Sequence, residues 1–248
     1  MNNINADILK TIENKIKQCP ICGGTRKLPN GDWCKCTKNA LDELRIVSSG
    51  IPQKYLKYNL SDYTLKDSVT YKNIQKYINK IDIAIKNGMG LFLWGQKYSG
   101  KTFLAIGTLR ELLKKGYKCY FVNFGNILSW YQSDTEKRNF IFNVDFLCID
   151  KIIQPLDIAH NVYAGTVSEN PTHYVSAVLE EIITNRGFKT KPTFITSELP
   201  IKNIYKKFGM LAMALREYCL ELNCESNDLM YQKMQDDIRA EFGFDELK

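Results

Sequence analysis

Residues 90–102 have the sequence Gly90-Leu91-Phe92-Leu93-Trp94-Gly95-Gln96-Lys97-Tyr98-Ser99-Gly100-Lys101-Thr102. The first five residues form an apolar run of strand length, and the last eight match the pattern G-x-x-x-x-G-K-[ST]. An apolar segment of helix length follows, to Lys115. A strand, a glycine-rich loop and a helix in this order bring backbone N–H groups and a helix N-terminus together around phosphate groups. The sequence therefore predicts a phosphate-binding loop.

The residue types of this loop predict how a nucleotide is held. We expect residues 95–102 to surround the phosphates of ATP, with Lys101 at the β- and γ-phosphates and the Thr102 hydroxyl on Mg²⁺. Such a site needs an acid at the end of a second strand. Phe146-Leu147-Cys148-Ile149-Asp150 supplies it, 49 residues after Lys101, which leaves room for one intervening strand and helix. Asp150 would complete the magnesium shell.

The apolar pattern beyond the loop predicts an α/β protein with a parallel sheet between helices, because strands and helices alternate along the chain. Strands are expected at 90–94, 118–124, 144–150, 193–196 and 219–222. Helices are expected at 2–17, 41–47, 71–86, 102–115, 126–132, 174–185, 201–217 and 228–241. Prolines and turn-forming residues predict an irregular loop at 151–173.

Composition limits the class of protein. The 248 residues are 44% apolar and 25% charged, as in soluble proteins that bury a core, and no apolar run approaches the length of a membrane span. The polar N-terminus does not resemble a signal peptide, so we expect a cytoplasmic protein without a membrane partner. A net charge of +7 is compatible with a nucleic-acid partner and equally with a lysine-rich composition.

Four of the eight cysteines cluster in the sequence, as Cys19, Cys22, Cys34 and Cys36. Two pairs of thiols on either side of a short hairpin predict a structural Zn²⁺ site with four thiolate ligands. Unliganded cysteines are the remaining alternative, since disulfides are rare in the cytosol. The turn-forming segment Ser49-Gly50-Ile51-Pro52 predicts a domain boundary. We expect a helical zinc-knuckle interaction domain at residues 1–50 and a nucleotide-binding domain at residues 51–248.

The order of these motifs resembles the DnaC/IstB-like AAA+ ATPases, which include replicative helicase loaders. The resemblance covers residues 19–224 and includes the Ser-Gly-Ile-Pro entry at 49–52 and the strand Lys191-Pro192-Thr193-Phe194-Ile195-Thr196-Ser197. It implies an AAA+ protein that places a replicative DNA helicase on single-stranded DNA and assembles with copies of itself. The N-terminal helix and the knuckle would then hold the helicase.

The resemblance also implies a role for Arg186, whose position matches that of an arginine finger offered to a neighbouring subunit. A solvated arginine at a helix end is the alternative interpretation. Three other positions depart from the family pattern. Lys151 stands where an acid usually polarises the attacking water, Glu198 replaces an asparagine that senses the γ-phosphate, and Arg216 lies about one helical turn after the expected arginine at 212.

These departures predict a protein that binds ATP and Mg²⁺ better than it hydrolyses ATP, because hydrolysis needs an oriented and polarised water. A substitute acid would have to come from elsewhere in the fold. The candidates are Glu198, Asp157, Glu169, Glu180 and Glu181.

Two other functions remain open. One is an IstB-like transposition helper ATPase that binds duplex DNA, and the other is a nucleotide-locked, non-hydrolysing adaptor of a replication or defence complex. Tyrosines and lysines interleaved over 54–77 fit base stacking with phosphate contacts, but packing of an amphipathic segment is the favoured interpretation.

Overall fold

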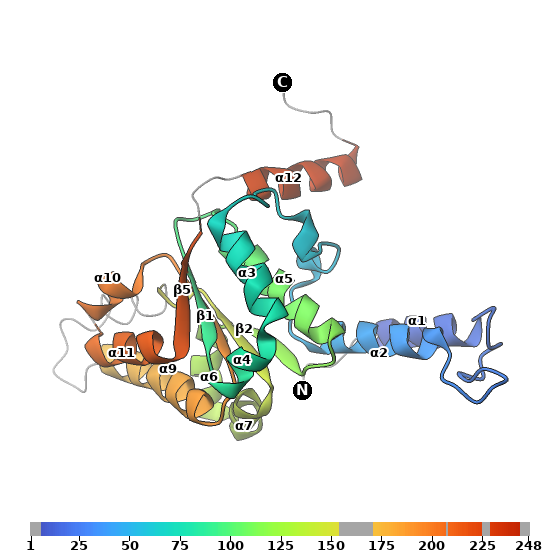
Figure 1. Cartoon of the computed structure of the whole chain (residues 1–248), viewed down its shortest axis with the longest axis horizontal. Coiled ribbons are helices and arrows are strands. Elements are labelled where there is room, and N and C mark those ends of the chain that lie inside the picture. The colour runs from blue at the N-terminus through green and yellow to red at the C-terminus, as the bar shows by residue number, and fades with distance from the viewer. Residues whose placement is uncertain (1–5, 154–170, 207, 225–228, 244–248) are drawn as a thin grey trace.

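The computed structural model describes residues 6–153, 171–206, 208–224 and 229–243. Its centre is a five-stranded parallel sheet in the order β2-β3-β4-β1-β5 (Figure 1). The strands are β1 (Gly90–Trp94), β2 (Cys119–Asn123), β3 (Phe146–Asp150), β4 (Thr193–Ser197) and β5 (Cys219–Asn223). Each begins and ends within two residues of its expected position, so the predicted parallel α/β sheet is confirmed.

Alternate side chains of the strands enter two separate apolar clusters, because successive residues of a strand face opposite sides. On one face, Phe92, Leu147 and Ile195 pack beneath α6 (Phe124–Ser133), α7 (Thr135–Asn143), α9 (Pro171–Phe188), α10 (Ile201–Tyr205) and α11 (Gly209–Tyr218). On the other face, Leu91, Phe146 and Phe194 pack beneath α3 (Val69–Asn79), α4 (Ile81–Lys86), α5 (Lys101–Lys114) and α12 (Leu229–Phe242). The result is a three-layer α/β/α body.

Two of the expected helices are divided in the structure. The helix expected at 71–86 is interrupted at Lys80, whose φ of −110° and ψ of 32° are not helical, so α3 and α4 are separate. The helix expected at 201–217 forms α10 and α11, with Phe208 in a non-helical conformation before Gly209. The sequence interpretation did not include α7, and most of the loop expected at 151–173 lies outside the described residues.

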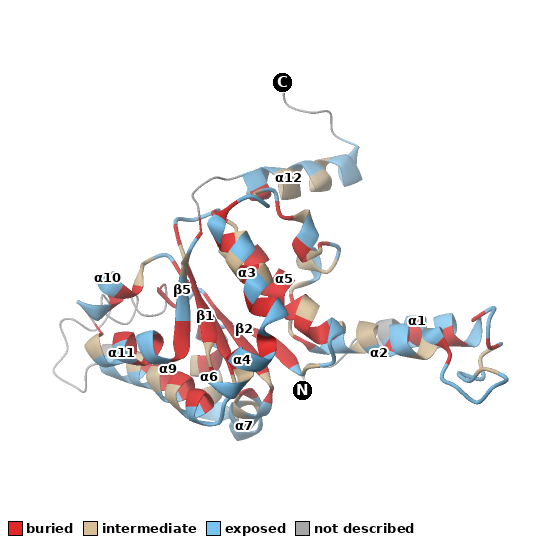
Figure 2. Cartoon of the chain, viewed as in Figure 1, coloured by how far each residue is buried: buried red, intermediate tan, exposed pale blue. Residues whose placement is uncertain are grey.

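An arm of two helices, α1 (Ala6–Lys17) and α2 (Lys35–Ser48), extends from this body (Figure 1). Ile12 and Ile16 of α1 pack against Ala40 and Leu44 of α2, and Lys15 bridges to Glu43 at 2.6 Å. The cysteine-rich connection between the helices forms the outer end of the arm. There the chain is buried mainly at the cysteines (Figure 2).

The inner end of the arm is fixed to the sheet at the predicted domain boundary. The Phe121 N–H of β2 donates to the Ser49 carbonyl at 2.7 Å. Gly50 has a φ of +73°, and a Cβ at this position would lie 2.3 Å from the Phe121 carbonyl oxygen, so only glycine fits. Among the described residues, no helix is long and apolar enough to cross a bilayer.

Two short 3₁₀ turns, η1 (Gln53–Tyr55) and η2 (Leu60–Asp62), continue from the boundary to α3. Tyr58, Tyr63 and Tyr77 in this region are buried, and the Tyr77 hydroxyl donates to the Met89 carbonyl at 2.7 Å. These tyrosines therefore belong to the core, as the packing interpretation of residues 54–77 favoured.

Candidate nucleotide-binding site and cysteine cluster

The loop from Gly95 to Thr102 connects β1 to α5, and two glycines fix its shape. The Gly95 N–H donates to the Ser197 carbonyl at 3.2 Å, which ties the start of the loop to the end of β4. Gly100 has a φ of +80° and precedes α5, and a Cβ there would lie 2.8 Å from a ring carbon of Tyr63. The loop is therefore held in a conformation that larger residues at these two positions would disturb.

Lys101, the first residue of α5, folds its side chain back over the loop. Its Nζ donates to the Gly95 carbonyl at 2.7 Å, the Gln96 carbonyl at 2.5 Å and the Ser99 hydroxyl at 3.2 Å. Partial burial lowers the pKa of Lys101, and electrostatic interactions with the nearby acidic groups of Cys224, Glu198 and Asp150 oppose that shift. The ammonium group is thus held at the loop, close to the backbone N–H groups at the start of α5.

The predicted magnesium ligands Thr102 and Asp150 are in direct contact. The Thr102 hydroxyl donates to Asp150 Oδ1 at 2.8 Å, and the Thr196 hydroxyl donates to the same oxygen at 2.6 Å. Thr196 also accepts the Lys151 N–H at 2.9 Å, and Asp150 is buried. A hydroxyl and a carboxylate side by side supply the oxygen ligands that Mg²⁺ prefers, so these residues fit the ion.

The sheet explains why these residues meet. In parallel strands all carboxyl ends lie at one edge, and the register pairs Trp94 of β1 with Ser197 of β4 and Ile149 of β3 with Ile195 of β4. The residues that follow β1, β3 and β4 are therefore neighbours at that edge. Ligands of open parallel sheets bind at such carboxyl edges.

Two of the three departures from the family pattern, Lys151 and Glu198, lie at the same edge of the sheet. Lys151 is exposed, with a φ of +60°, and Glu198 is exposed directly after β4, within electrostatic reach of Lys101. Glu181 on α9 lies beside the Tyr131 side chain of α6, and Glu180 also belongs to α9. Asp157 and Glu169 lie outside the described residues. Of the candidate acids that the structure describes, Glu198 follows a strand that contacts the loop.

Arg216, the third departure, lies near the end of α11, just before β5 begins and therefore away from the carboxyl edge where the loop lies. It is exposed on α11, and its guanidinium lies 5.3 Å from the ring centroid of Tyr205, whereas Ala212 is fully buried.

The expectation that Arg186 is an arginine finger is wrong for this structure. Arg186 is 0% exposed, and its guanidinium donates five hydrogen bonds within the chain. The acceptors are the Thr193 hydroxyl and the carbonyls of Ile141, Val144, Asp145 and Pro192. Burial lowers its pKa to about 9, so it keeps its charge at neutral pH. A group enclosed in this way joins α7, α9 and β4 and cannot reach a neighbouring subunit.

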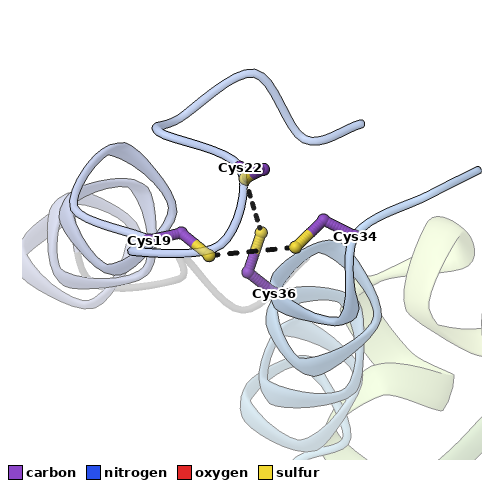
Figure 3. A group of neighbouring side chains, drawn as sticks. All are labelled: Cys19, Cys22, Cys34 and Cys36. Atoms are coloured by element: carbon purple, nitrogen blue, oxygen red, sulfur yellow. Dashed lines mark hydrogen bonds between the residues drawn. The ribbon is translucent and has the colours of Figure 1, made fainter. Parts of the chain in front are cut away.

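The four clustered cysteines converge at the outer end of the arm (Figure 3). Their sulfurs all lie within 4.8 Å of one another, with Cys19 to Cys34 at 3.8 Å and Cys22 to Cys36 at 3.5 Å. A tetrahedral ion with Zn–S distances of about 2.3 Å requires sulfurs about 3.8 Å apart. The donor set and its spacing therefore fit zinc.

Hydrogen bonds between the cysteines shift the pKa values of Cys22 and Cys36 in opposite directions. Desolvation alone would raise both pKa values, but hydrogen bonding with Cys36 contributes to lowering the pKa of Cys22 to about 6. At Cys36, desolvation and the hydrogen bond with Cys22 both raise the pKa, to about 12. The hydrogen bonds at Cys22 therefore favour its thiolate, which is the form of cysteine that binds metal.

The sheet order, the glycine-rich loop after β1 and the acid at the end of β3 are the arrangement of the AAA+ fold. Solved structures with the same fold include DnaI, with a TM-score of 0.56 and 21% identity over 72% of this chain and 93% of that chain. The DnaC helicase loader has a TM-score of 0.55 and 21% identity over 70% of this chain and 100% of its own.

The replication initiator DnaA bound to AMPPCP and single-stranded DNA is also similar, with a TM-score of 0.55 and 15% identity. That match covers 78% of this chain and 57% of the DnaA chain. No family model matches the sequence, and no curated protein matches it at the sequence level. The likeness therefore establishes the AAA+ fold.

Two features of the site were not predicted from the sequence. Thr196 positions Asp150, and its signal was a polar residue near the end of an otherwise apolar strand. Tyr98 in the loop contacts Tyr231 of α12, with ring centroids 4.5 Å apart. No local pattern marks that contact, because 133 residues of sequence separate the two rings.

Proposed function

We propose that this chain binds ATP with Mg²⁺ at residues 95–102. Lys101 would hold the β- and γ-phosphates, and Thr102 and Asp150 would hold the magnesium ion. The observation that carries this proposal is the hydrogen bond from Thr102 to Asp150 at 2.8 Å, which brings the two expected metal ligands together at the carboxyl edge of the sheet. The bound ion would neutralise phosphate charge.

The biological role that these features support best is loading of a replicative DNA helicase onto single-stranded DNA during replication initiation. The body has the fold of the DnaC helicase loader, and the arm extends away from it (Figure 1). Exposed apolar residues on the arm helices, Leu9 and Leu41, offer contacts for a protein partner. We propose that zinc holds the outer end of the arm and that the AAA+ bodies assemble with one another.

The second candidate function is a nucleotide-locked adaptor that binds ATP without turnover. Its support is the lack of an acid directly after Asp150, where the exposed Lys151 stands. A cationic side chain at this position cannot polarise a water as a base. Glu198 is the described acid best placed to substitute for it, because it follows β4 and acts electrostatically on Lys101.

The loader role can be tested by reconstitution with the replicative helicase of the same replication system and a covalently closed single-stranded DNA circle. We expect the full chain with ATP to increase the amount of helicase on the circle, and Lys101→Ala to abolish the increase. Lys114→Ala is the matched control, because Lys114 is an exposed lysine at the other end of α5, outside the loop.

Each alternative has its own result in this assay. An increase that also occurs without ATP would contradict a nucleotide-controlled loader. Preference for duplex DNA with no effect on helicase would favour the transposition helper. Helicase loading without phosphate release would favour the nucleotide-locked form of the same assembly.

A further inference from the structure

The outer end of the arm, residues 17–38, is a small hairpin whose two faces differ. Lys27 and Trp33 form an antiparallel pair, and backbone hydrogen bonds on both sides of the pair fix the register. Because side chains alternate across a strand, the neighbouring residues Leu28 and Cys34 pack inward at the sulfur cluster. Lys27 and Trp33 both remain exposed on the outer face.

Trp33 is the most exposed tryptophan of the chain, with 67% of its surface open to solvent. The Lys27 ammonium lies over this ring, 5.5 Å from its centroid. Leaving so much of an indole in water forgoes the hydrophobic gain that burial would give. Residues 17–38 therefore present a large flat ring next to a cation.

The surroundings of Trp33 are strongly basic. The exposed cations of residues 17–38 are Lys17, Arg26, Lys27, Lys35 and Lys38. The opposing carboxylate in this segment is Asp32, which also accepts a hydrogen bond from the Asn30 amide at 2.8 Å. A zinc tetrathiolate carries two negative charges, so the segment remains net positive with the metal bound.

We propose that the outer end of the arm binds single-stranded nucleic acid, with Trp33 stacking on an unpaired base and Lys27 and its basic neighbours binding the adjacent phosphates. A duplex keeps its bases stacked internally and would not offer one to the ring. A protein partner fits less well, because Ile21 is the other exposed large apolar residue of 17–38 and interface cores are more apolar. The site lies apart from the nucleotide loop, so the proposal does not rest on the proposed function.

Binding can be measured with the full zinc-containing chain and labelled oligothymidylate, oligouridylate and duplex DNA, using fluorescence anisotropy at several salt concentrations. The measurements are repeated in a Lys101→Ala background, which separates this site from any strand held by assembled AAA+ bodies. We expect Trp33→Ala to weaken single-strand binding roughly tenfold or more, the range for loss of one stacked base. Lys27→Ala should reduce the salt slope by about 0.7, the value for one phosphate contact with a single strand.

Two control variants separate loss of the stacking ring from a general change in the segment. Trp33→Phe should retain most of the affinity because it keeps an aromatic face, and Ile21→Ala should leave it unchanged although it is exposed on the same segment. Zinc content is measured for each variant. If Trp33→Ala loses zinc, Trp33→Leu replaces it as the variant that keeps apolar bulk without a stacking ring.

The proposal is wrong if the variants without an aromatic ring at position 33 bind single strands as well as the wild type does. Equal, Trp33-dependent binding of duplex would also overturn it. The proposal would also be overturned if Trp33→Ala lost a co-purifying protein but bound oligonucleotides as well as the wild type does. Trp33-dependent binding of either the deoxy or the ribo oligonucleotide supports it, and the stronger of the two identifies the sugar.

Discussion

The guanidinium of Arg186 donates hydrogen bonds to backbone carbonyls from three places in the chain. These are Ile141 near the end of α7, Val144 directly after α7, and Pro192 directly before β4. Replacing Arg186 by methionine would keep much of the volume but leave buried carbonyl oxygens without donors, which costs about 1–3 kcal/mol for each group that water cannot reach. We expect Arg186→Met to lower the free energy of unfolding by about 3 kcal/mol or more, measured by urea denaturation at dilute concentration.

Arg216→Met is the matched control, because Arg216 is exposed and contacts only a solvent-facing ring among its described contacts. It should change the unfolding free energy by less than about 1 kcal/mol. An Arg186→Met chain with wild-type stability, and a defect only when subunits assemble, would restore the arginine-finger interpretation.

The Thr196 hydroxyl holds Asp150 in place, because it donates a hydrogen bond to the Asp150 carboxylate and accepts one from the Lys151 backbone N–H. Thr196→Val keeps the shape and removes both bonds. We expect a loss of about 1–3 kcal/mol in unfolding free energy and weaker Mg²⁺-dependent binding of ATP, measured by titration calorimetry. Thr108→Val removes a buried hydroxyl bond inside α5 and should spare the magnesium dependence. Equal magnesium dependence in both variants would count against the positioning role.

At the scale of elements, the strands were predictable because apolar runs between turn signals marked each one. The divided helices were not, because α3 and α4 have a continuous apolar periodicity across Lys80 and only its backbone angles separate them. The contact of Tyr98 with Tyr231 and the enclosure of Arg186 depend on segments distant in sequence. The loop, its lysine and the cysteine cluster were found because their chemistry depends on local spacing.

The cysteine cluster gives a prediction for the arm. Metal analysis should find one zinc per chain, and the double variant Cys34→Ser, Cys36→Ser should lose it while retaining ATP binding, because the sulfurs lie in the arm and the loop in the body. Cys119→Ala, which changes a buried cysteine of β2, should keep the zinc. A double variant that retains stoichiometric zinc would show that these four thiols are not its ligands.

Helix α12 contacts the body through a hydrogen bond that the Tyr58 hydroxyl donates to the Asp237 carboxylate at 2.7 Å. This bond is the largest cause of the lowered pKa of Asp237. A carboxyl with a depressed pKa stabilises the fold above its unfolded pKa of about 3.9, and this contribution is lost as pH falls through the lower folded value. Acidification below about pH 4 should therefore loosen α12.

Substitution separates this bond from the general effect of acid. Asp237→Asn should speed hydrogen exchange in residues 229–242 at neutral pH, consistent with a loss of about 1 kcal/mol. Asp236→Asn, which removes an exposed carboxylate paired with Arg239, should not. Equal exchange in the two variants would contradict this role of Asp237.

For the whole molecule, the central proposal is that the chain binds ATP·Mg²⁺ far better than it hydrolyses ATP. Lys101, Thr102 and Asp150 are arranged as nucleotide and magnesium binding requires. In contrast, the residue after Asp150, where a base would polarise the attacking water, is Lys151. Assembly and partner binding would then depend on nucleotide occupancy, because a ligand stabilises whichever state it binds better.

The most direct test measures ATP binding and phosphate release on the same preparation, with Mg²⁺, single-stranded DNA and the partner helicase present. We expect saturable ATP binding that Lys101→Ala abolishes, turnover well below about 1 s⁻¹, and faster turnover in Lys151→Glu. Wild-type turnover of about 1 s⁻¹ or more, or undiminished ATP binding by Lys101→Ala, would contradict the proposal.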